Sequence, residues 1–546
     1  MTKRTIILYA GILSAAALTA QEPDSTLNRT IVVENQYNPE VMDAFKVNIL
    51  PEIEEPAVAK KEIDYATGIR PFSGWTAVPM PSFVPDAGQK NAQRGYLRAA
   101  YGNRNNTDIK GSYLWDITSQ DRLGVMASLY GMYGNIPYLE DAGKWKSRFY
   151  RTDISLDYKH DFRKVSLNVG GAFASQVFNY MPDYDLTNDL PATARQHYTL
   201  GEGYVGIASR GKEMPVDFSL QTGFRTFNRK YPNGHIGEGA ENTIHTEGSV
   251  TGEISEAQHI SIGLTMDNLI YETPVKDYTL LQINPCYTLQ NDDISLRVGA
   301  HADLQTANGS GMKFAPDVKL AYTFAGSYVV YVQTAGGTRL NDFRHLNEIS
   351  PYWDQRQQLR TSYTPIDASI GLKASPADGF GFRLYGGYRI TKNELFSLPG
   401  SFGSNASCLL LQDKAKVAYA GASVSYAYRD WIDFTLKGAY YDWKTESKDD
   451  RLLWLKPRFG IDFSARGKVA DNLHITVDYL YEGRSEAAGW KKADAINSLN
   501  IGAEYLLFDR LTLFVRLNNL LDKYYLTEAG YPVQGFNVMG GLSFRF

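Results

Sequence analysis

The sequence has few cysteines, few histidines and little net charge. Only two of its 546 residues are cysteine, Cys286 and Cys408, so a framework of several disulfides and a cysteine-only zinc site are excluded, and one isolated bridge stays open. The eight histidines are scattered and form no HExxH pattern or other close metal-ligand spacing. A net charge of −4 is small for this length and argues against a partner that is nucleic acid.

Long apolar runs are also missing from most of the chain. Beyond residue 20, no stretch approaches the roughly 20 apolar residues that a membrane-spanning helix needs. The mean hydropathy is −0.33, whereas a helical membrane protein would be far more hydrophobic. A transmembrane β-barrel tolerates this value, because about half of its strand residues face a polar lumen.

What the sequence does contain is a two-residue alternation, and it is clearest near the C-terminus. One parity of the last segment is apolar or small: Phe536, Val538, Gly540, Leu542, Phe544 and Phe546. The other parity is mostly polar or small: Asn537, Met539, Gly541, Ser543 and Arg545. Side chains alternate between the faces of a strand, so this pattern predicts an amphipathic strand. We expect it to close a sheet, with Phe546 as the barrel-closing terminal residue.

The residues just before this strand carry a family resemblance. The motif consists of Asn519, Leu520, Leu521, Asp522, Lys523 and Tyr525, and Gly530-Tyr531-Pro532 follows it. It resembles the C-terminal signature of TonB-dependent outer-membrane receptors, in which an Asn-Leu-Phe-Asp-Lys-x-Tyr run leads into the last extracellular loop and strand. The resemblance covers about 36 residues closely, and the rest of the barrel only in its architecture. It implies an all-β, transmembrane antiparallel barrel.

Alternation extends over the chain from about residue 94 to residue 546. We predict about 22 strands, with the last two over 511–525 and 534–546. Links after even-numbered strands are short turns, such as His160-Asp161 and Arg429-Asp430, and links after odd-numbered strands are generally longer. Short periplasmic turns and long extracellular loops are typical of an outer-membrane barrel. We therefore assign residues 91–546 to the barrel.

The N-terminus predicts export. A basic start, Met1-Thr2-Lys3-Arg4, precedes a mostly apolar run from Thr5 to Leu18, and the small residues Thr19 and Ala20 follow. Residues 1–20 are therefore expected to be a signal peptide cleaved after Ala20. An exported chain without a helical anchor, ending on a closing strand, is expected in the outer membrane of a Gram-negative bacterium, with outer-membrane lipid around it.

Residues 21–90 differ from the barrel. They hold eight of the 22 prolines, and proline is excluded from central strands, so we expect a short, extended periplasmic segment. Within it Thr30, Ile31, Val32 and Val33 resemble the TonB box, which in the family pairs with a strand of the energising protein TonB. The alternative is a stray extended segment or a contact with the barrel. Only about 60 residues separate this box from the first strand, so a full family-sized plug domain is apparently absent.

No constellation for chemistry is apparent, so we predict no enzyme, no catalytic residue, no metal and no cofactor. Aromatic residues cluster where strands meet loops, namely Tyr130, Tyr133, Tyr138, Tyr440, Tyr441, Trp443, Tyr524, Tyr525 and Tyr531. We interpret them as a girdle at the lipid–water interface, with a ring-stacking site in the loops as the alternative.

Three functions are compatible with the sequence. The first is a receptor-like barrel for uptake of a solute across the outer membrane, with TonB as a partner. The second is a plugless barrel subunit of an outer-membrane protein assembly, whose partner is another periplasmic or outer-membrane protein. The third is a passive pore. The ligand is not indicated by any residue pattern.

Overall fold

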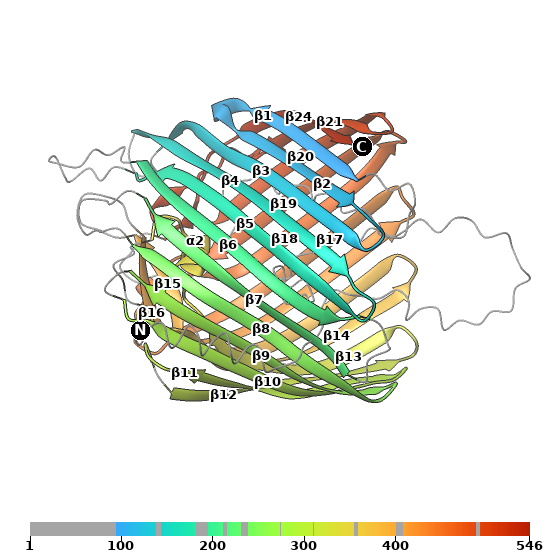
Figure 1. The fold of residues 1–546 in the computed structure, drawn as a ribbon. Helices are drawn as coiled ribbons and strands as arrows, with labels where there is room; N and C mark the ends of the chain where they lie inside the picture. Colours follow the sequence, from blue (N-terminus) through green and yellow to red (C-terminus); the bar gives the residue numbers. More distant parts are fainter. Residues whose placement is uncertain are drawn as a thin grey trace, which may run out of the picture.

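The computed structural model describes residues 94–546, apart from 138–142, 182–194, 211–215, 231–238, 273–274, 310, 354–356, 358, 400–407 and 487–491. Within this part of the chain, 22 strands form one antiparallel sheet that is rolled into a barrel (Figure 1). The sheet closes on itself because the first strand pairs with both the second and the last. Leu97 lies opposite Gly111 on one side and opposite Phe544 on the other.

The barrel strands follow one another around the ring in chain order. They are β1 (Gly95–Gly102), β2 (Thr107–Asp116), β3 (Asp121–Pro137), β4 (Lys144–Asp161), β5 (Val165–Asn179), β6 (Arg195–Ser209), β7 (Val216–Arg229), β8 (Ala240–Ser255), β9 (Gln258–Tyr271), β10 (Tyr278–Gln290), β11 (Ile294–Gln305), β12 (Gly311–Phe324), β13 (Tyr328–Arg339), β14 (Ser362–Ala377), β15 (Phe380–Pro399), β16 (Cys408–Tyr428), β17 (Ile432–Thr445), β18 (Pro457–Ala470), β19 (Leu473–Arg484), β20 (Ile496–Phe508), β21 (Leu511–Asn518) and β24 (Asn537–Arg545).

The short elements of the described ranges lie in the connections between barrel strands. A 3-10 turn, η3 (Asn103–Asn105), joins β1 to β2, and another, η4 (Asp450–Leu453), lies between β17 and β18. Helix α2 (Phe343–Ile349) lies between β13 and β14. Strands β22 (Leu526–Glu528) and β23 (Tyr531–Pro532) form a separate small hairpin between β21 and β24. No helix in the described ranges is long and apolar enough to cross a membrane.

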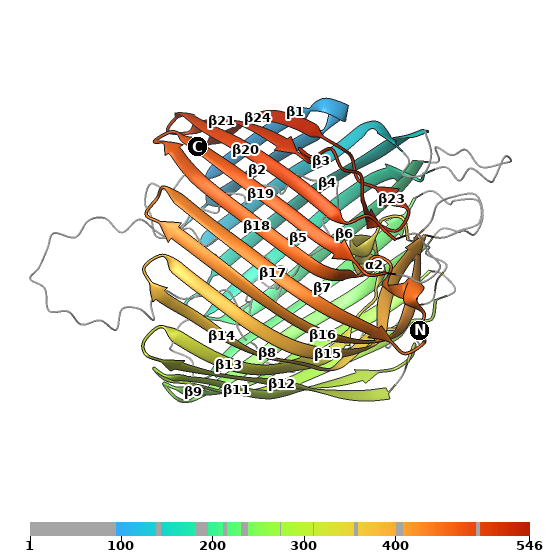
Figure 2. The same cartoon turned by 180° about the vertical axis from the view of Figure 1, so that it is seen from behind.

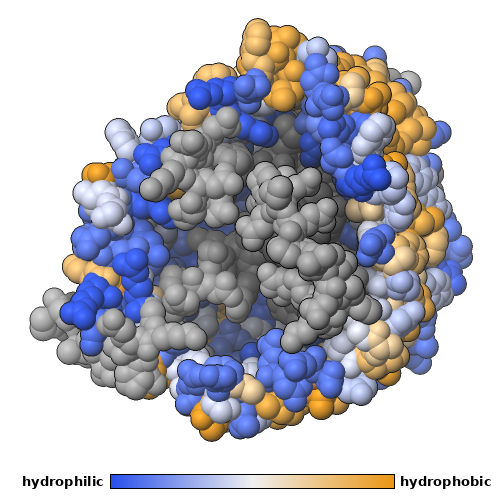
Figure 3. Space-filling view, turned by 90° about the vertical axis from the view of Figure 1, so that its right-hand side faces the viewer, coloured by the Kyte–Doolittle hydropathy of each residue, from blue (hydrophilic) through white to orange (hydrophobic). Residues whose placement is uncertain are grey.

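The residues that alternate along each strand face opposite sides of the barrel wall, one set the lumen and the other the outside. On β9, Ile260 and Ile262 are 49% and 52% exposed, while Asp267 of the opposite parity is buried in the lumen. Exposed aliphatic side chains on the outer wall are unfavourable in water and favourable in lipid, as a transmembrane barrel requires. Figure 3 shows hydrophobic side chains on this outer wall and hydrophilic ones around the barrel end.

The two ends of the barrel differ in their connections. Tight turns lie at the end where the C-terminus is found, on the right of Figure 1. In one of them Ala325 and Gly326 both have positive φ, 49° and 73°, as the twist of a two-residue hairpin favours. In another, the Asn291 side chain accepts a hydrogen bond from the Ile294 N–H at 2.7 Å. The opposite end carries the longer connections and α2.

The predicted strand count of 22 and the closing position of the last strand are confirmed. The predicted strand over 511–525 is too long, because β21 ends at Asn518. Asn519 and Asp522 have φ of +48°, which is a turn conformation and not an extended one, and the chain leaves the wall there. Cys286 and Cys408 are both buried free thiols, so the bridge that the sequence left open does not form.

Candidate functional site

The loop between β13 and β14, residues 340–361, crosses the barrel mouth at the long-loop end. In α2, Asn347 exchanges hydrogen bonds with Gln176 of β5, at 3.3 and 3.2 Å. Farther along, Gln357 exchanges bonds with the Leu410 backbone of β16, at 2.8 and 2.9 Å. Because β5 and β16 lie on opposite sides of the 22-stranded ring, this β13–β14 loop connects the two walls.

A large apolar cluster surrounds the loop inside the mouth, and we call it the mouth core. Its buried members come from β3 to β7, from β15 and β16, and from three connections: Met132, Ile136, Trp145, Phe149, Ala174, Phe178, Tyr180, Tyr198, Leu200, Phe227, Phe343, Leu346, Tyr352, Trp353, Leu395, Cys408, Leu410, Ala529 and Tyr531. Tyr352 and Trp353 are fully buried, at 0% exposure. Burial of large rings stabilises the inward position of the loop by several kcal/mol, on the order of 1.5–3 kcal/mol per side chain.

A second loop, residues 519–536 between β21 and β24, contributes to the same core. Tyr531 of β23 stacks on Tyr352, with ring centroids 3.4 Å apart and planes inclined by 4°. The Tyr531 hydroxyl oxygen accepts a hydrogen bond from the Met181 N–H at 3.2 Å, and its ring meets the edge of Trp145 at 5.5 Å. Figure 2 shows β23 and α2 at the same end of the barrel. The two loops therefore pack against each other inside the mouth.

Polar contacts fix the start of α2. Asp342 is the N-cap, and its side chain accepts a hydrogen bond from the His345 N–H at 2.8 Å, which satisfies an otherwise unpaired helix donor. The neighbouring Phe343 N–H donates to the buried Glu241 carboxylate of β8 at 2.8 Å. Burial raises the pKa of the Asp342 carboxyl, while the His345 N–H bond and the positive charge of Arg344 act in the opposite direction.

Ionic contacts hold the exposed face of α2 to the wall. The Arg344 guanidinium donates to Glu202 of β6 at 2.9 Å and to the Gly201 carbonyl at 3.2 Å. Glu202 also accepts from Arg225 of β7 at 3.1 Å, so one carboxylate lies between two arginines. All three side chains are less than a quarter exposed, which strengthens these pairs relative to surface ion pairs.

One buried hydrogen bond joins the two loops directly. The Ser350 hydroxyl donates to the Glu528 carboxylate at 2.7 Å, and both residues are buried. On the other side of the second loop, Arg484 of β19 donates to the Leu526 carbonyl at 2.8 Å. A buried bond to a charged group is costly to break, so this bond adds to the contacts that hold the two loops together.

Beyond the mouth core, paired charges line the lumen. His245 lies 2.6 Å from Asp267, Arg297 donates to Asp317 at 2.6 Å, and Arg98 donates to Asp108 at 2.6 Å. These pairs come from separate sectors of the wall, β8–β9, β11–β12 and β1–β2. The lumen wall therefore carries mixed, mutually paired charge, as the polar interior of a transmembrane barrel does.

The C-terminal motif forms the junction where β21 leaves the wall. The Asn519 side chain donates to the carbonyls of Lys523 and Gln534, at 2.7 and 3.1 Å, and accepts from the Lys523 N–H at 3.2 Å. Asp522 accepts from the Phe536 N–H at 2.7 Å, at the start of the last strand. Tyr525 is buried, while Leu520 and Leu521 are exposed at 38% and 39%. The motif thus shapes the second mouth loop.

At the seam, Phe546 lies against the first strand. Its N–H donates to the Gly95 carbonyl at 3.0 Å, and the Gly95 N–H donates to the Phe546 carbonyl at 2.7 Å. Its ring stacks with Tyr113 of β2 at 5.9 Å.

Comparison with solved structures identifies this architecture. The FrpB iron transporter from Neisseria meningitidis superposes with a TM-score of 0.66 at 10% identity, over 83% of this chain and 81% of that one. The ferric enterobactin receptor PfeA from Pseudomonas aeruginosa gives 0.65 at 12% identity, over 83% and 80%. FpvA from P. aeruginosa, bound to a pyoverdine–iron complex, gives 0.62 at 14% identity, over 83% and 72%. The chain has the barrel fold of the TonB-dependent receptors. This fold belongs to the outer membrane of Gram-negative bacteria.

Sequence comparison adds one short match. The vitamin B12 transporter BtuB of Photobacterium profundum is 32% identical over 80 residues, which are 14% of this chain. The match spans 13% of that transporter's length. No protein-family model matches the chain.

Several predicted features of a TonB-dependent receptor lie outside the described residues. These are the signal peptide of residues 1–20, the extended segment of residues 21–90, and the candidate TonB box of Thr30, Ile31, Val32 and Val33. Among the residues that the structure describes, no group of three or more His, Cys, Asp or Glu side chains could hold a metal ion.

The aromatic girdle prediction is only partly right for this barrel. Tyr440 is 45% exposed on the outer wall, as a girdle residue should be. Tyr525 and Tyr531 are buried at 2%, inside the mouth, and Tyr130 packs against the mouth core. Residue spacing at a strand end does not distinguish a ring that points to lipid from one on a loop that folds inward.

Sequence reasoning missed the residues that close the mouth. The strand pattern predicts only that links after odd-numbered strands are generally longer, and it singles out neither residues 340–361 nor Glu202. One available signal was the apolar and aromatic content of this link, with Phe343, Leu346, Ile349, Tyr352 and Trp353 within a short span. A solvent-exposed loop would not carry so many large apolar side chains.

Proposed function

We propose that this barrel takes part in uptake of a solute across the outer membrane, and that the β13–β14 loop closes its extracellular mouth between transport events. The observation that carries the proposal is the mouth core, in which Tyr352 and Tyr531 stack between walls on opposite sides. A loop packed this way can leave only as a unit, which suits a gate with two discrete positions.

The closed mouth argues against a passive pore. A general pore needs a continuous aqueous channel, whereas here rings and a helix are packed across the entrance. The paired charges on the wall, such as Arg297–Asp317, supply a polar path for a solute once the mouth opens.

The class of solute is inferred from the proteins that resemble this chain in fold or sequence. The similar structures include receptors named for ferric enterobactin and for a pyoverdine–iron complex, and the short sequence match is a vitamin B12 transporter. We infer a solute too large for general porins. The ring-rich mouth core, which includes Trp145, Tyr352 and Tyr531, would present stacking surfaces to such a solute when the loops separate.

Energy for opening would come from the periplasmic side. We propose that Thr30, Ile31, Val32 and Val33 serve as the TonB box, because a short β-prone segment on an extended tether suits edge-strand addition. With a segment of residues 21–90 too short for a family-sized plug, loop closure takes over part of the sealing in this proposal.

Conductance in a planar bilayer tests the gate. The full-length protein should be almost silent, and Tyr352→Ala should give frequent openings, because truncation of a buried ring weakens the closed state by about 3–5 kcal/mol. Tyr440→Ala removes a ring on the outer wall and serves as the matched control. A large, steady conductance in the unaltered protein would identify a passive pore instead.

Removal of Thr30–Val33 tests the coupling. The deletion should abolish co-purification with TonB and abolish uptake in cells, while the barrel still assembles in the outer membrane. If the deletion instead removes a different co-purified envelope protein and leaves uptake unchanged, the barrel is a subunit of an outer-membrane assembly.

A further inference from the structure

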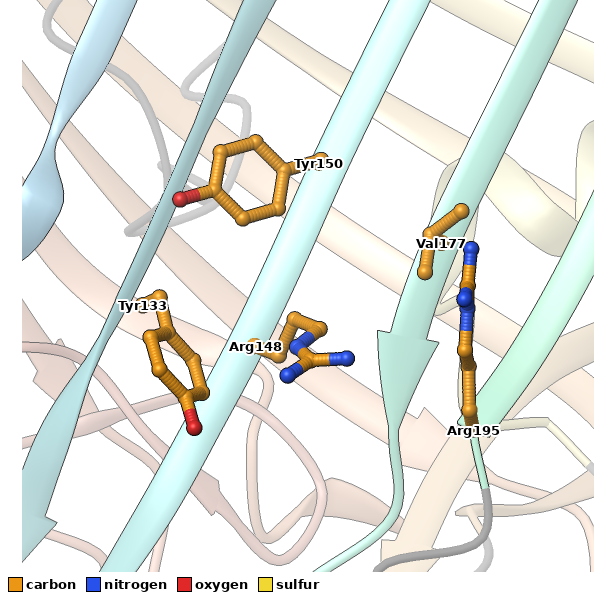
Figure 4. Close-up of a pocket in the computed structure, with 5 residues that line it drawn as sticks. All are labelled: Tyr133, Arg148, Tyr150, Val177 and Arg195. Carbon is orange, nitrogen blue, oxygen red and sulfur yellow. The ribbon is translucent and has the colours of Figure 1, made fainter.

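A hollow of about 350 Å³ lies on the outer wall, near the long-loop end of β3 to β6. It is lined by Tyr133, Arg148, Tyr150, Val177 and Arg195 (Figure 4). All five point away from the lumen, because their strand neighbours Met132, Ser147, Phe149, Phe178 and Gln196 are buried inside. The hollow therefore opens sideways toward lipid and not into the transport path.

A glycine creates the space for this hollow. Gly131 of β3 lies opposite Tyr150 of β4. A Cβ at Gly131 would stand 2.7 Å from the Tyr150 ring atom Cδ1 and 2.1 Å from the Phe149 carbonyl oxygen. The Tyr150 ring thus lies over bare backbone, and a depression remains between it and Tyr133.

Positive charge gathers around the hollow. The Lys146 ammonium and the Arg148 guanidinium each lie 4.7 Å from the centre of the Tyr133 ring. Arg195 is exposed on the other side of Val177. Within the described part of the chain, no carboxylate pairs with Lys146, Arg148 or Arg195. Elsewhere at this end of the wall, Lys414 and Lys444 are each paired, with Glu446 at 2.7 Å and Asp442 at 3.4 Å.

The depth of these charges matches a lipid headgroup. Tyr150 and Thr152 follow Arg148 on the outward face of β4, and the exposed Ile154 and Leu156 come after them, toward the membrane centre. Ile154 lies six positions after Arg148, and in a strand tilted by about 45° this places the two residues about 14 Å apart along the membrane normal. This is about half of the roughly 30 Å hydrocarbon core, so Arg148 and Arg195 lie at the level of headgroup phosphates.

We propose that this hollow binds the phosphate group of an anionic lipid in the outer leaflet. Arg148 and Arg195 form charge-assisted hydrogen bonds to the phosphate oxygens, and Lys146 adds a third positive charge. The acyl chains lie along the exposed Ile154, Phe173 and Val205 below the hollow. Tyr133 and Tyr150 provide the amphipathic rings that suit the boundary between headgroup and acyl chain.

Native mass spectrometry of the full-length protein in detergent, titrated with diphosphorylated lipid A, tests this site. We expect a saturable lipid adduct. The triple variant Lys146→Ala, Arg148→Ala, Arg195→Ala should weaken it at least tenfold, since each basic residue near a membrane surface contributes about fivefold. The matched control is the double variant Lys414→Ala, Lys444→Ala, which removes paired charges and should leave the adduct unchanged.

Two further probes separate a lipid site from other binding. A neutral galactolipid without phosphate should bind at least tenfold more weakly than lipid A, and inorganic phosphate at equal concentration should not displace lipid A. Equal adducts in the triple variant and the unaltered protein, or an equal loss in the control variant, would overturn the proposal. Equal binding of the galactolipid would also overturn it. Displacement by inorganic phosphate would overturn it as well and would identify a free-phosphate site.

Discussion

Tyr352 and Tyr531 stack face to face inside the barrel mouth, although one belongs to the β13–β14 loop and the other to the loop before the last strand. Their rings lie nearly parallel, and both residues are at most 2% exposed. Two loops from different parts of the sequence therefore share one interface, and opening of the mouth requires that this interface separate.

Tyr531→Ala should open the mouth while the barrel wall stays intact. The change removes the stacking partner of Tyr352 and a contact with Trp145, which together are worth about 3–5 kcal/mol for a buried aromatic side chain. Limited proteolysis of intact cells should then cleave within 340–361 at least tenfold faster. Tyr531→Phe keeps the ring and loses the hydroxyl that accepts the bond from Met181, so equal cleavage of both variants would contradict the stacking argument.

The Arg344–Glu202 pair should couple α2 to the wall. In a double-mutant cycle with Arg344→Met and Glu202→Gln, we expect an interaction energy of about 1.5–3 kcal/mol for loop closure, as is usual for hydrogen bonds between charged groups. Open probability in a planar bilayer measures it. Additive effects of the two single changes would mean that Arg344 does not hold the loop.

Loop closure should weaken as the pH rises. Burial raises the pKa of Asp342 in the closed loop above its usual range near 4, so the closed state favours the protonated carboxyl. The closed state thus loses relative stability as the pH climbs from about 4 toward that raised pKa. Asp342→Asn retains a capping oxygen for the His345 N–H and should reduce the pH dependence of open probability, while the buried Glu241 carboxylate beside Phe343 remains. If Asp342→Asn shows the same pH profile of open probability as the unaltered protein, another group causes the pH dependence.

Asn519→Ala should loosen the second mouth loop. The side chain makes three hydrogen bonds to the loop backbone, and the residue has φ of +48°, which Asn tolerates better than Ala. We expect a loss of about 2–4 kcal/mol, seen as faster amide hydrogen exchange over 519–536. Asn519→Gly separates the two causes, since glycine accepts the backbone angle but restores no bond. Full recovery in the glycine variant would show that backbone strain alone accounts for the loss.

The wall of the barrel could be predicted from the sequence because each strand carries its own evidence. Alternation of residues such as Ile260, Ser261 and Ile262 reports which side faces lipid, and that signal does not depend on distant parts of the chain. Turn residues such as Asn291 add a second local signal. Fold class, strand number and sidedness therefore follow from short windows of sequence.

The mouth could not be predicted in the same way, because its stability comes from contacts between segments far apart in the chain. Ser350 meets Glu528, and Trp353 lies beside Cys408, only after the barrel has closed. Positive φ at Asn519 likewise ended β21 earlier than its alternation suggested. A hydrophobicity pattern identifies that a loop such as 340–361 is apolar, but not which surface buries it.

Glycine at the seam supplies a last prediction. Gly541 of β24 lies opposite Ala100 of β1, and a Cβ there would stand 2.3 Å from the Ala99 carbonyl oxygen. Because the clash is with backbone, Gly541→Val should prevent the final pairing of β24 with β1 and lower the yield of folded barrel at least severalfold. Heat-modifiable gel mobility of outer-membrane fractions measures that yield.

Gly252→Val, where nothing lies within 4 Å of the added Cβ, is the matched control in a strand of the same sheet. Normal yield of the Gly541 variant would show that the seam can shift to accept a side chain, and a comparable defect in the control would mean that valine is harmful at any glycine of this wall.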